Sequence, residues 1–175
     1  MLETNRLILR PMKSEDSLNL FLLNQDPEVL QWTGDQASHN LADAQRILTD
    51  HVYPQFQLYK MGRFAVLLKD GTWLGWCGLK YFPETNEVDL GYRFMKKYWG
   101  QGYATEACEA CLEYGFEVLK IKKIIARAMP QNLPSIKVLQ KLKMTYSGLK
   151  NDSHYPGGYV IYELSAEDYR KCKNS

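Results

Sequence analysis

Residues 63–95 constrain the fold most strongly, because three segments with strand periodicity follow one another at short intervals. The segments read RFAVLLK, TWLGWCGLKYF and EVDLGYRFM. Asp70-Gly71 separates the first two, and this dipeptide is typical of a tight hairpin turn. The turn-rich group PETN at residues 83–86 precedes the third. The three segments therefore predict an antiparallel meander.

Other segments predict helices and further strands around this meander. We expect strands in residues 6–12, 122–129 and 159–165, the last closing the sheet, and helices in residues 14–26, 41–60, 105–119 and 132–142. Ser14 and Asn132 are candidate N-caps, Asp26-Pro27 is expected to end or kink the first helix, and Pro54 is expected to interrupt the second. The polar residues after 165 predict a helical turn.

The third helical segment has a simple division of faces. Ala107, Cys111, Tyr114 and Val118 share an apolar face, while glutamates line another. Without a linker or repeat, the 175 residues predict one α+β domain, residues 1–175 with a core of about 2–168, built on a central mixed, mostly antiparallel sheet.

Composition excludes several classes of protein. The net charge of +2 does not indicate a nucleic-acid partner. No segment has the 18 or more apolar residues of a membrane span, so no membrane partner is expected. Charged Glu3, Arg6 and Arg10 interrupt the apolar start of the chain, which argues against a signal peptide. We expect a cytoplasmic protein.

Cys108 and Cys111 form a CxxC motif, which is typical of zinc-binding and redox-active sites. No second CxxC and no nearby histidine complete four zinc ligands, so no metal site is expected. Both cysteines fall in a helical pattern beside alanines. They predict buried, reduced thiols.

The segment YWGQGYATEAC, residues 98–108, combines the end of a strand-like stretch with a glycine-rich turn and a helix start. Free amides and the helix dipole attract anions at a helix start, and small residues at Gly100, Gly102 and Ala104 let a phosphate approach. No lysine follows Gly102 as in a Walker A loop, and Thr105 breaks the Rossmann glycine pattern. The alternative to a phosphate site is a simple tight turn between a strand and a helix.

The loop resembles the acyl-CoA pyrophosphate loop of the GNAT superfamily of N-acetyltransferases, Q/R-x-x-G-x-G/A. Here the motif reads Trp99-x-x-Gly102-x-Ala104. YWGQGYATEA, ETNRLILRP, DLGY and the pair Asn132-x-x-Ser135 resemble the RimJ/RimL-type branch, which acetylates protein N-termini or small amines. The resemblance covers residues 2–168 in order. One departure is Trp99 in place of a cationic or amide side chain, so main-chain amides, helped by Lys96 or Lys97, have to hold the pyrophosphate.

The resemblance implies acetyl-CoA as co-substrate and strands 87–95 and 122–129 that splay apart to admit pantetheine. A backbone amide near residues 90–92 faces the thioester oxygen, and Gly91 marks either close approach of a ligand or simple packing. The implied cofactor-binding residues are Phe94, Met95, Gly100, Gln101, Gly102, Tyr103, Ala104, Thr105, Asn132 and Lys137.

Three residues are candidates for proton transfer. Period-two geometry puts Glu87 and Asp89 on one face of their strand, with Leu90 and Tyr92 pointing into the core. Asp89 is the expected base or anchor for the substrate ammonium, with Glu87 as second choice. Alternatively, both acids simply face solvent. Many members of the family use a tyrosine as proton donor at the position that Leu139 occupies here. The resemblance therefore implies Ser135 as the donor to the sulfur. The alternative is that Ser135 is an ordinary serine in the first turn of a helix.

The resemblance therefore implies an acetyl-CoA-dependent N-acetyltransferase in which an amine attacks the thioester directly within a ternary complex. A non-catalytic CoA-binding sensor or regulatory module on the same fold is the alternative. The acceptor is a small-molecule amine or a protein N-terminus, and the protein a monomer or homodimer. Its acceptor side is expected to come from the first two helices and the last hairpin, residues 151–162. Candidate aromatic walls there are Trp32, Tyr53, Phe56, Tyr59 and Tyr155, with His39 and His51 nearby.

Overall fold

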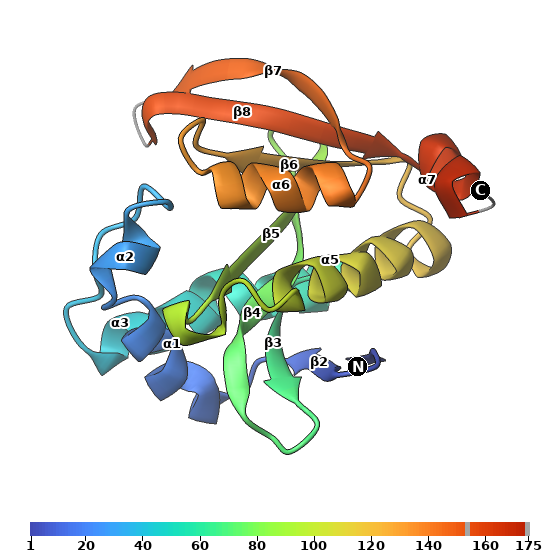
Figure 1. The fold of residues 1–175 in the computed structure, drawn as a ribbon. Coiled ribbons are helices and arrows are strands. Elements are labelled where there is room, and N and C mark those ends of the chain that lie inside the picture. Colours follow the sequence, from blue (N-terminus) through green and yellow to red (C-terminus); the bar gives the residue numbers. More distant parts are fainter. Residues whose placement is uncertain (153–154, 174–175) are drawn as a thin grey trace.

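The computed structural model describes residues 1–152 and 155–173. The described residues form an eight-stranded sheet in the order β1-β2-β3-β4-β5-β6-β8-β7 (Figure 1). The strands are β1 (Leu2–Glu3), β2 (Leu7–Pro11), β3 (Arg63–Leu68), β4 (Trp73–Phe82), β5 (Glu87–Phe94), β6 (Lys123–Ala128), β7 (Thr145–Asp152) and β8 (Tyr155–Ser165). The predicted meander is confirmed as β3-β4-β5, paired antiparallel throughout. The predicted α+β class with a mostly antiparallel sheet is confirmed as well.

The sheet opens between two interior strands, β5 and β6. Their parallel ladder has a single Cα pair, Asp89 with Ile125, whereas β5 pairs with β4 along eight positions from Glu87 to Phe94. Figure 1 shows the two strands running in clearly different directions. The sheet is therefore splayed at its centre, as the resemblance implies.

Helices cover both faces of the sheet and so create two hydrophobic cores. On one face, α5 (Tyr103–Glu113) packs on β4 and β5 and α6 (Leu133–Lys141) packs on β6, which buries residues such as Cys108 and Leu139. On the other, α1 (Ser17–Leu23), α2 (Pro27–Leu30) and α3 (Leu41–Arg46) bury residues such as Leu23 and Ala44. Because side chains alternate along a strand, β5 sends odd-numbered residues toward α1–α3 and even-numbered ones toward α5.

Two helix-boundary predictions near the N-terminus are wrong. Ser14 does not cap a helix but begins a short 3₁₀ turn, Ser14–Asp16, in which the Asp16 carboxylate accepts the Lys13 N–H at 2.7 Å. Asp26-Pro27 begins α2 rather than ending α1, which stops at Leu23. The Asp26 side chain accepts the Glu28 N–H, and proline suits the first turn of a helix because its missing N–H has no partner there.

Pro54 is accommodated inside a continuous helical stretch. A π-helical segment, Ile47–Val52, follows α3 and leads into α4 (Tyr53–Tyr59), where Pro54 occupies the first turn. A proline lacks the N–H for one helical hydrogen bond and crowds the carbonyl four residues earlier, and the π-helical segment covers these preceding residues.

A second π-helical segment, Tyr114–Val118, ends α5 and changes which residues are buried. Ala107 and Cys111 are fully buried as predicted, but the side of the helix assigned to Val118 is wrong, since this residue is 64% exposed. The hydrogen bonds of a π-helix span five residues instead of four. The extra residue rotates the side chains that follow by about 100° around the helix axis, and this carries Val118 away from the buried face.

The predicted burial of the cysteines is confirmed. Cys77, Cys108 and Cys111 are buried and free, with the Cys77 sulfur 3.6 Å from that of Cys108 and 3.7 Å from that of Cys111. Burial raises the pKa of the Cys108 thiol.

The C-terminal elements differ from the prediction in two respects. β8 does not close the sheet, because β7 pairs outside it and forms the edge. The expected helical turn is an eight-residue helix, α7 (Ala166–Lys173). Within residues 1–152 and 155–173, no helix combines the length and apolarity required to cross a bilayer.

Candidate functional site

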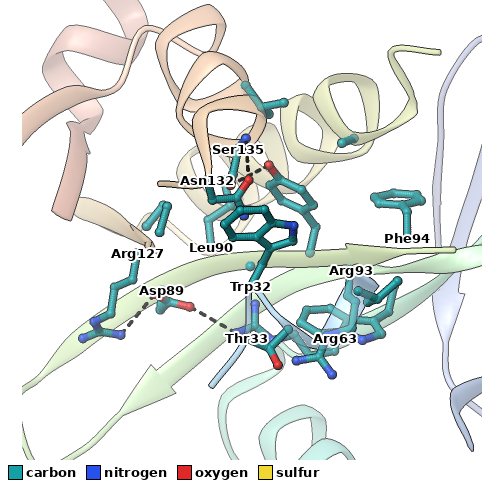
Figure 2. A pocket seen from close by; sticks show the side chains of 18 of the residues that line it. Trp32, Thr33, Arg63, Asp89, Leu90, Arg93, Phe94, Arg127, Asn132 and Ser135 are labelled. Atoms are coloured by element: carbon teal, nitrogen blue, oxygen red, sulfur yellow. Dashed lines mark hydrogen bonds and ion pairs between the residues drawn. The ribbon is translucent and has the colours of Figure 1, made fainter. Parts of the chain in front are cut away.

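A cleft of about 1290 Å³ lies at the point where β5 and β6 diverge. Its walls include β5, the end of β6, the glycine loop and α6. Figure 2 shows lining residues from β5, β6 and α6. Predicted site residues that line it are Asp89, Phe94, Gly100, Gly102, Tyr103, Ala104, Thr105, Asn132, Ser135 and Lys137. Glu87, Met95 and Gln101 are not among the lining residues. The cleft therefore gathers most, but not all, of the predicted set.

The glycine loop needs glycine for its backbone conformation. Gly100 has φ +74° and Gly102 has φ +81°, a left-handed region that strains other residues. Gly102 is also the N-cap of α5, so the free amides of the first helical turn follow it directly along the cleft wall. The loop thus presents backbone donors without intervening side chains.

Arg6 holds this loop in place from the opposite end of the sequence. Its Nη1 donates to the Gln101 carbonyl at 3.0 Å and its Nε donates to Glu106 at 2.6 Å. Its guanidinium also lies 4.5 Å from the centroid of the Tyr103 ring. Arg6 was not among the predicted site residues, because nothing local connects residue 6 with residues 101–106.

Glu106 accepts a hydrogen bond from Arg6 and so helps to hold Arg6 on the glycine loop, and its pKa is lowered. Burial disfavours its charged form, but hydrogen bonds from the Thr4 hydroxyl, at 2.6 Å, and from Arg6 outweigh burial and lower the pKa of Glu106. Its negative charge near the start of α5 is compensated by Arg6, so the pair leaves little repulsion for an anion at the loop.

Trp99, the departure from the family motif, turns back onto the end of β5. Its indole N–H donates to the Phe94 carbonyl at 2.8 Å, and the side chain is 42% exposed. The expected helpers do not line the cleft: Lys96 forms an ion pair with Glu28, and the Lys97 ammonium lies 4.9 Å from the Tyr98 ring centroid. The expectation that Lys96 or Lys97 supports the pyrophosphate is therefore not met by this geometry.

Asp89 is buried between two arginines. It is 7% exposed, accepts from Arg63 Nη2 at 3.1 Å on one carboxylate oxygen, and accepts from Arg127 Nη1 at 3.1 Å on the other (Figure 2). Arg127 also donates to Glu87 at 2.7 Å. The alternative in which both acids simply face solvent is wrong, because β5 is a central strand and β3 and β6 supply the two arginines.

Gly91 leaves room for Arg63. A Cβ at Gly91 would lie 2.5 Å from Arg63 Nη1, so the guanidinium passes directly over this glycine on its way from β3 to Asp89. The close approach at Gly91 is made by a side chain of the protein itself, which agrees with the packing alternative rather than with a ligand.

Ser135 meets a tyrosine hydroxyl on the other face of β5. The Asn132 side chain accepts the Ser135 N–H at 3.2 Å, confirming the predicted cap, and the Ser135 hydroxyl lies 2.9 Å from that of Tyr92 (Figure 2). Burial is the main cause that raises the pKa of Tyr92 above its usual value. A neutral Tyr92 hydroxyl is a proton donor. The tyrosine was predicted only as a core residue, although the motif DLGY contains it.

The opposite end of the cleft has a different aromatic lining from the one predicted. Trp32 and His51 line it, whereas Tyr53, Phe56, Tyr59 and His39 do not. The side chain of Tyr155 lies outside the described residues, as does His154. Further aromatic walls come from strands: Trp76 and Phe82 on β4 and Tyr159 on β8.

Comparisons with known proteins give consistent results. The model of a family described as acetyltransferase (GNAT) domain matches residues 6–145. An uncharacterized N-acetyltransferase p20 from Bacillus licheniformis is 31% identical over 162 residues, 91% of this chain and 90% of that protein. Among solved structures, a GNAT-family acetyltransferase from Bacillus anthracis has a TM-score of 0.80 at 26% identity, covering 95% of this chain and 98% of that one.

A ribosomal-protein-S5-alanine acetyltransferase from Vibrio fischeri has a similar fold. The TM-score is 0.77 at 21% identity, and the match covers 95% of this chain and 97% of that one.

Proposed function

The chain belongs to the GNAT family and is an N-acetyltransferase, and we propose that it moves the acetyl group of acetyl-CoA to a primary amine by direct attack in a ternary complex. The observation that carries this proposal is the cleft between β5 and β6, with the glycine loop on its wall and the Ser135–Tyr92 hydroxyl pair beside it. The likeness to the RimJ/RimL-type branch supports an amine as acceptor.

Acetyl-CoA fits the cleft in three parts. The pyrophosphate binds the amides that follow Gly102, where the helix N-terminus favours an anion. Lys137 on α6 lines the same cleft and supplies a cation for a phosphate group. Pantetheine extends along β5 toward Phe94, where the β5–β6 ladder is missing and strand hydrogen-bonding groups face the gap.

The reaction forms a C–N bond and breaks the C–S bond of the thioester. The amine nitrogen attacks the carbonyl carbon, the sulfur leaves as thiolate and takes up a proton, and the attacking nitrogen loses one. We assign the donated proton to Ser135, whose hydroxyl is joined to the neutral Tyr92 hydroxyl. A β5 backbone N–H near Leu90 stabilises the carbonyl oxygen.

Asp89 is the proposed acceptor of the proton from the amine, through a water molecule. Arg63 and Arg127 fix the direction of its carboxylate, and it lines the cleft next to the point of strand divergence. Glu87 is bound by Arg127 and by the Thr85 hydroxyl and does not line the cleft, so we assign it a supporting role.

Calorimetric titration with acetyl-CoA, followed by detection of released CoA thiol in the presence of amines, tests the proposal. Micromolar binding together with amine-dependent CoA release supports acetyl transfer. Binding without release from any amine supports the alternative, a CoA-binding sensor or regulatory module. If acetyl-CoA does not bind, the glycine loop is only a turn. That result would overturn both the proposed acetyl transfer and the CoA-binding alternative.

A further inference from the structure

The cleft wall on the α1–α3 side of the sheet is rich in cations. Of the described residues that line it there, four carry positive side chains and two carry carboxylates: Arg63, Lys80, Arg93 and Arg127 against Asp35 and Asp89. A site for a polycation requires an excess of carboxylates, because each buried ammonium needs an opposite charge. This wall has the reverse balance and suits an anion.

The two carboxylates on this wall are already paired. Asp89 binds Arg63 and Arg127, and Asp35 binds Arg93, which also donates to the Asn24 side chain. An incoming cationic group would have to compete with these arginines. The arginines themselves are held by protein groups and are fixed in position.

Lys80 is the exception among these cations. It lies directly opposite Asp89 in the β4–β5 ladder and therefore on the same face of the sheet. Its ammonium contacts the face of Phe82, 4.6 Å from the ring centroid, and no ion pair or hydrogen bond joins it to another residue in the described part of the chain. The pKa of Lys80 is lowered mainly by burial and secondly by the positive charge of Arg63. The negative charges of Asp89 and Glu84 act in the opposite direction and raise it. Its surroundings thus leave a half-buried ammonium that feels nearby carboxylate charges but has no carboxylate in direct contact within the described residues.

We propose that Lys80 binds a carboxylate of the acceptor, and that the acceptor is accordingly an amine that also carries a carboxylate, such as an amino acid, rather than a polyamine. This inference rests on the proposed acetyl transfer. An acceptor carboxylate gives Lys80 its missing partner in a partly desolvated site, where a charge-assisted hydrogen bond is strong. Phe82, which contacts Lys80, and Trp32 and Tyr159, which line the same cleft, offer apolar contact to the rest of such a molecule.

A panel of matched acceptors tests this inference by release of CoA thiol. Tryptophan against tryptamine and leucine against isoamylamine differ in the carboxylate alone, phosphoethanolamine against ethanolamine tests a phosphate, and spermidine and a hexapeptide represent the competing classes. We expect kcat/KM to be about ten- to a hundredfold higher with the carboxylate, in line with a hydrogen bond to a charged group. Preference for spermidine, the peptide or the phosphate overturns the inference but not acetyl transfer. No turnover with any amine overturns the proposed function, and the inference with it.

Substitution of Lys80 identifies the residue responsible. Lys80→Met keeps most of the unbranched stem of the side chain and removes the charge, so the preference for tryptophan over tryptamine should fall about tenfold, while Lys80→Arg should restore part of it. Lys122→Met, at an exposed lysine outside the cleft, is the matched control and should leave the preference intact. Calorimetric affinity for acetyl-CoA and the melting temperature should be similar in all variants. An unchanged preference in a folded Lys80→Met protein rejects the role of Lys80.

Discussion

The hydroxyl oxygens of Tyr92 and Ser135 lie 2.9 Å apart, although 43 positions separate the two residues in the chain. Tyr92 comes from the splayed strand β5 and Ser135 from the first turn of α6, where the Asn132 cap fixes the serine backbone. The pair sits beside the cleft on the face of β5 opposite Asp89. The proposed proton donor and the proposed proton acceptor thus lie on opposite faces of one strand, and acetyl transfer requires two proton transfers.

Removal of either hydroxyl tests proton donation to the sulfur. Ser135→Ala should lower kcat by about a hundredfold, the usual contribution of a positioned acid, and Tyr92→Phe should lower it less, because Ser135 remains. Affinity for acetyl-CoA, measured by calorimetry, should change little. If kcat is unchanged in both variants, the thiolate leaves unaided and the pair is structural.

Asp89→Asn tests the proposed base and also probes stability. The Asn side chain has nearly the same shape but cannot take a proton, so kcat should fall about a hundredfold while acetyl-CoA still binds. Loss of the charge between Arg63 and Arg127 should also lower the free energy of unfolding by about 3 kcal/mol, measured in urea.

Glu87→Gln is the matched control for Asp89→Asn. It disturbs the same Arg127 but lies outside the cleft lining, so it should keep most of the activity. Equal loss of activity in the two variants would remove any special role for Asp89.

Arg6→Met tests whether the hydrogen bonds of Arg6 hold the glycine loop in place. Without the bonds to Gln101 and Glu106, the loop has to be ordered by the ligand, and the dissociation constant for acetyl-CoA should rise about tenfold. Lys69→Met breaks the Glu3–Lys69 ion pair at the same edge of the sheet without touching the loop, and it should leave this constant unchanged. Equal affinity of wild type and Arg6→Met contradicts a preorganised loop.

The pH dependence of stability reports on Glu106. Its pKa is lower in the folded protein, so the unfolded chain binds more protons, and the contribution to stability is present above the unfolded value of about 4.3 and is lost as the pH falls through the folded pKa. Urea unfolding of wild type and Glu106→Gln between pH 3 and 7 should show a difference that is constant near neutrality and shrinks below about pH 4. A pH-independent difference would falsify this assignment.

Much of the local structure could be predicted from the sequence. The β3-β4-β5 meander, the Asp70-Gly71 hairpin, the Asn132 cap and the glycine loop at the start of α5 depend on residues within a few positions of each other. Periodicity, turn chemistry and capping act over that range, and the family motif falls within it. Local patterns were less reliable where a proline was involved, because Pro27 and Pro54 are equally compatible with the start of a helix and with its end.

Tertiary structure alone decided which side chains meet. Arg63 and Arg127 reach Asp89 from β3 and β6, Arg6 reaches the glycine loop from the N-terminus, and Tyr92 reaches Ser135. Each contact joins elements that become neighbours only when the sheet forms and the helices pack on it. The sequence by itself determined the elements, the loop and the family, because these follow from short-range rules. Strand order and helix packing determined the balance of charges on the cleft wall on the α1–α3 side of the sheet, because the distances that set electrostatic interactions exist only in the folded chain.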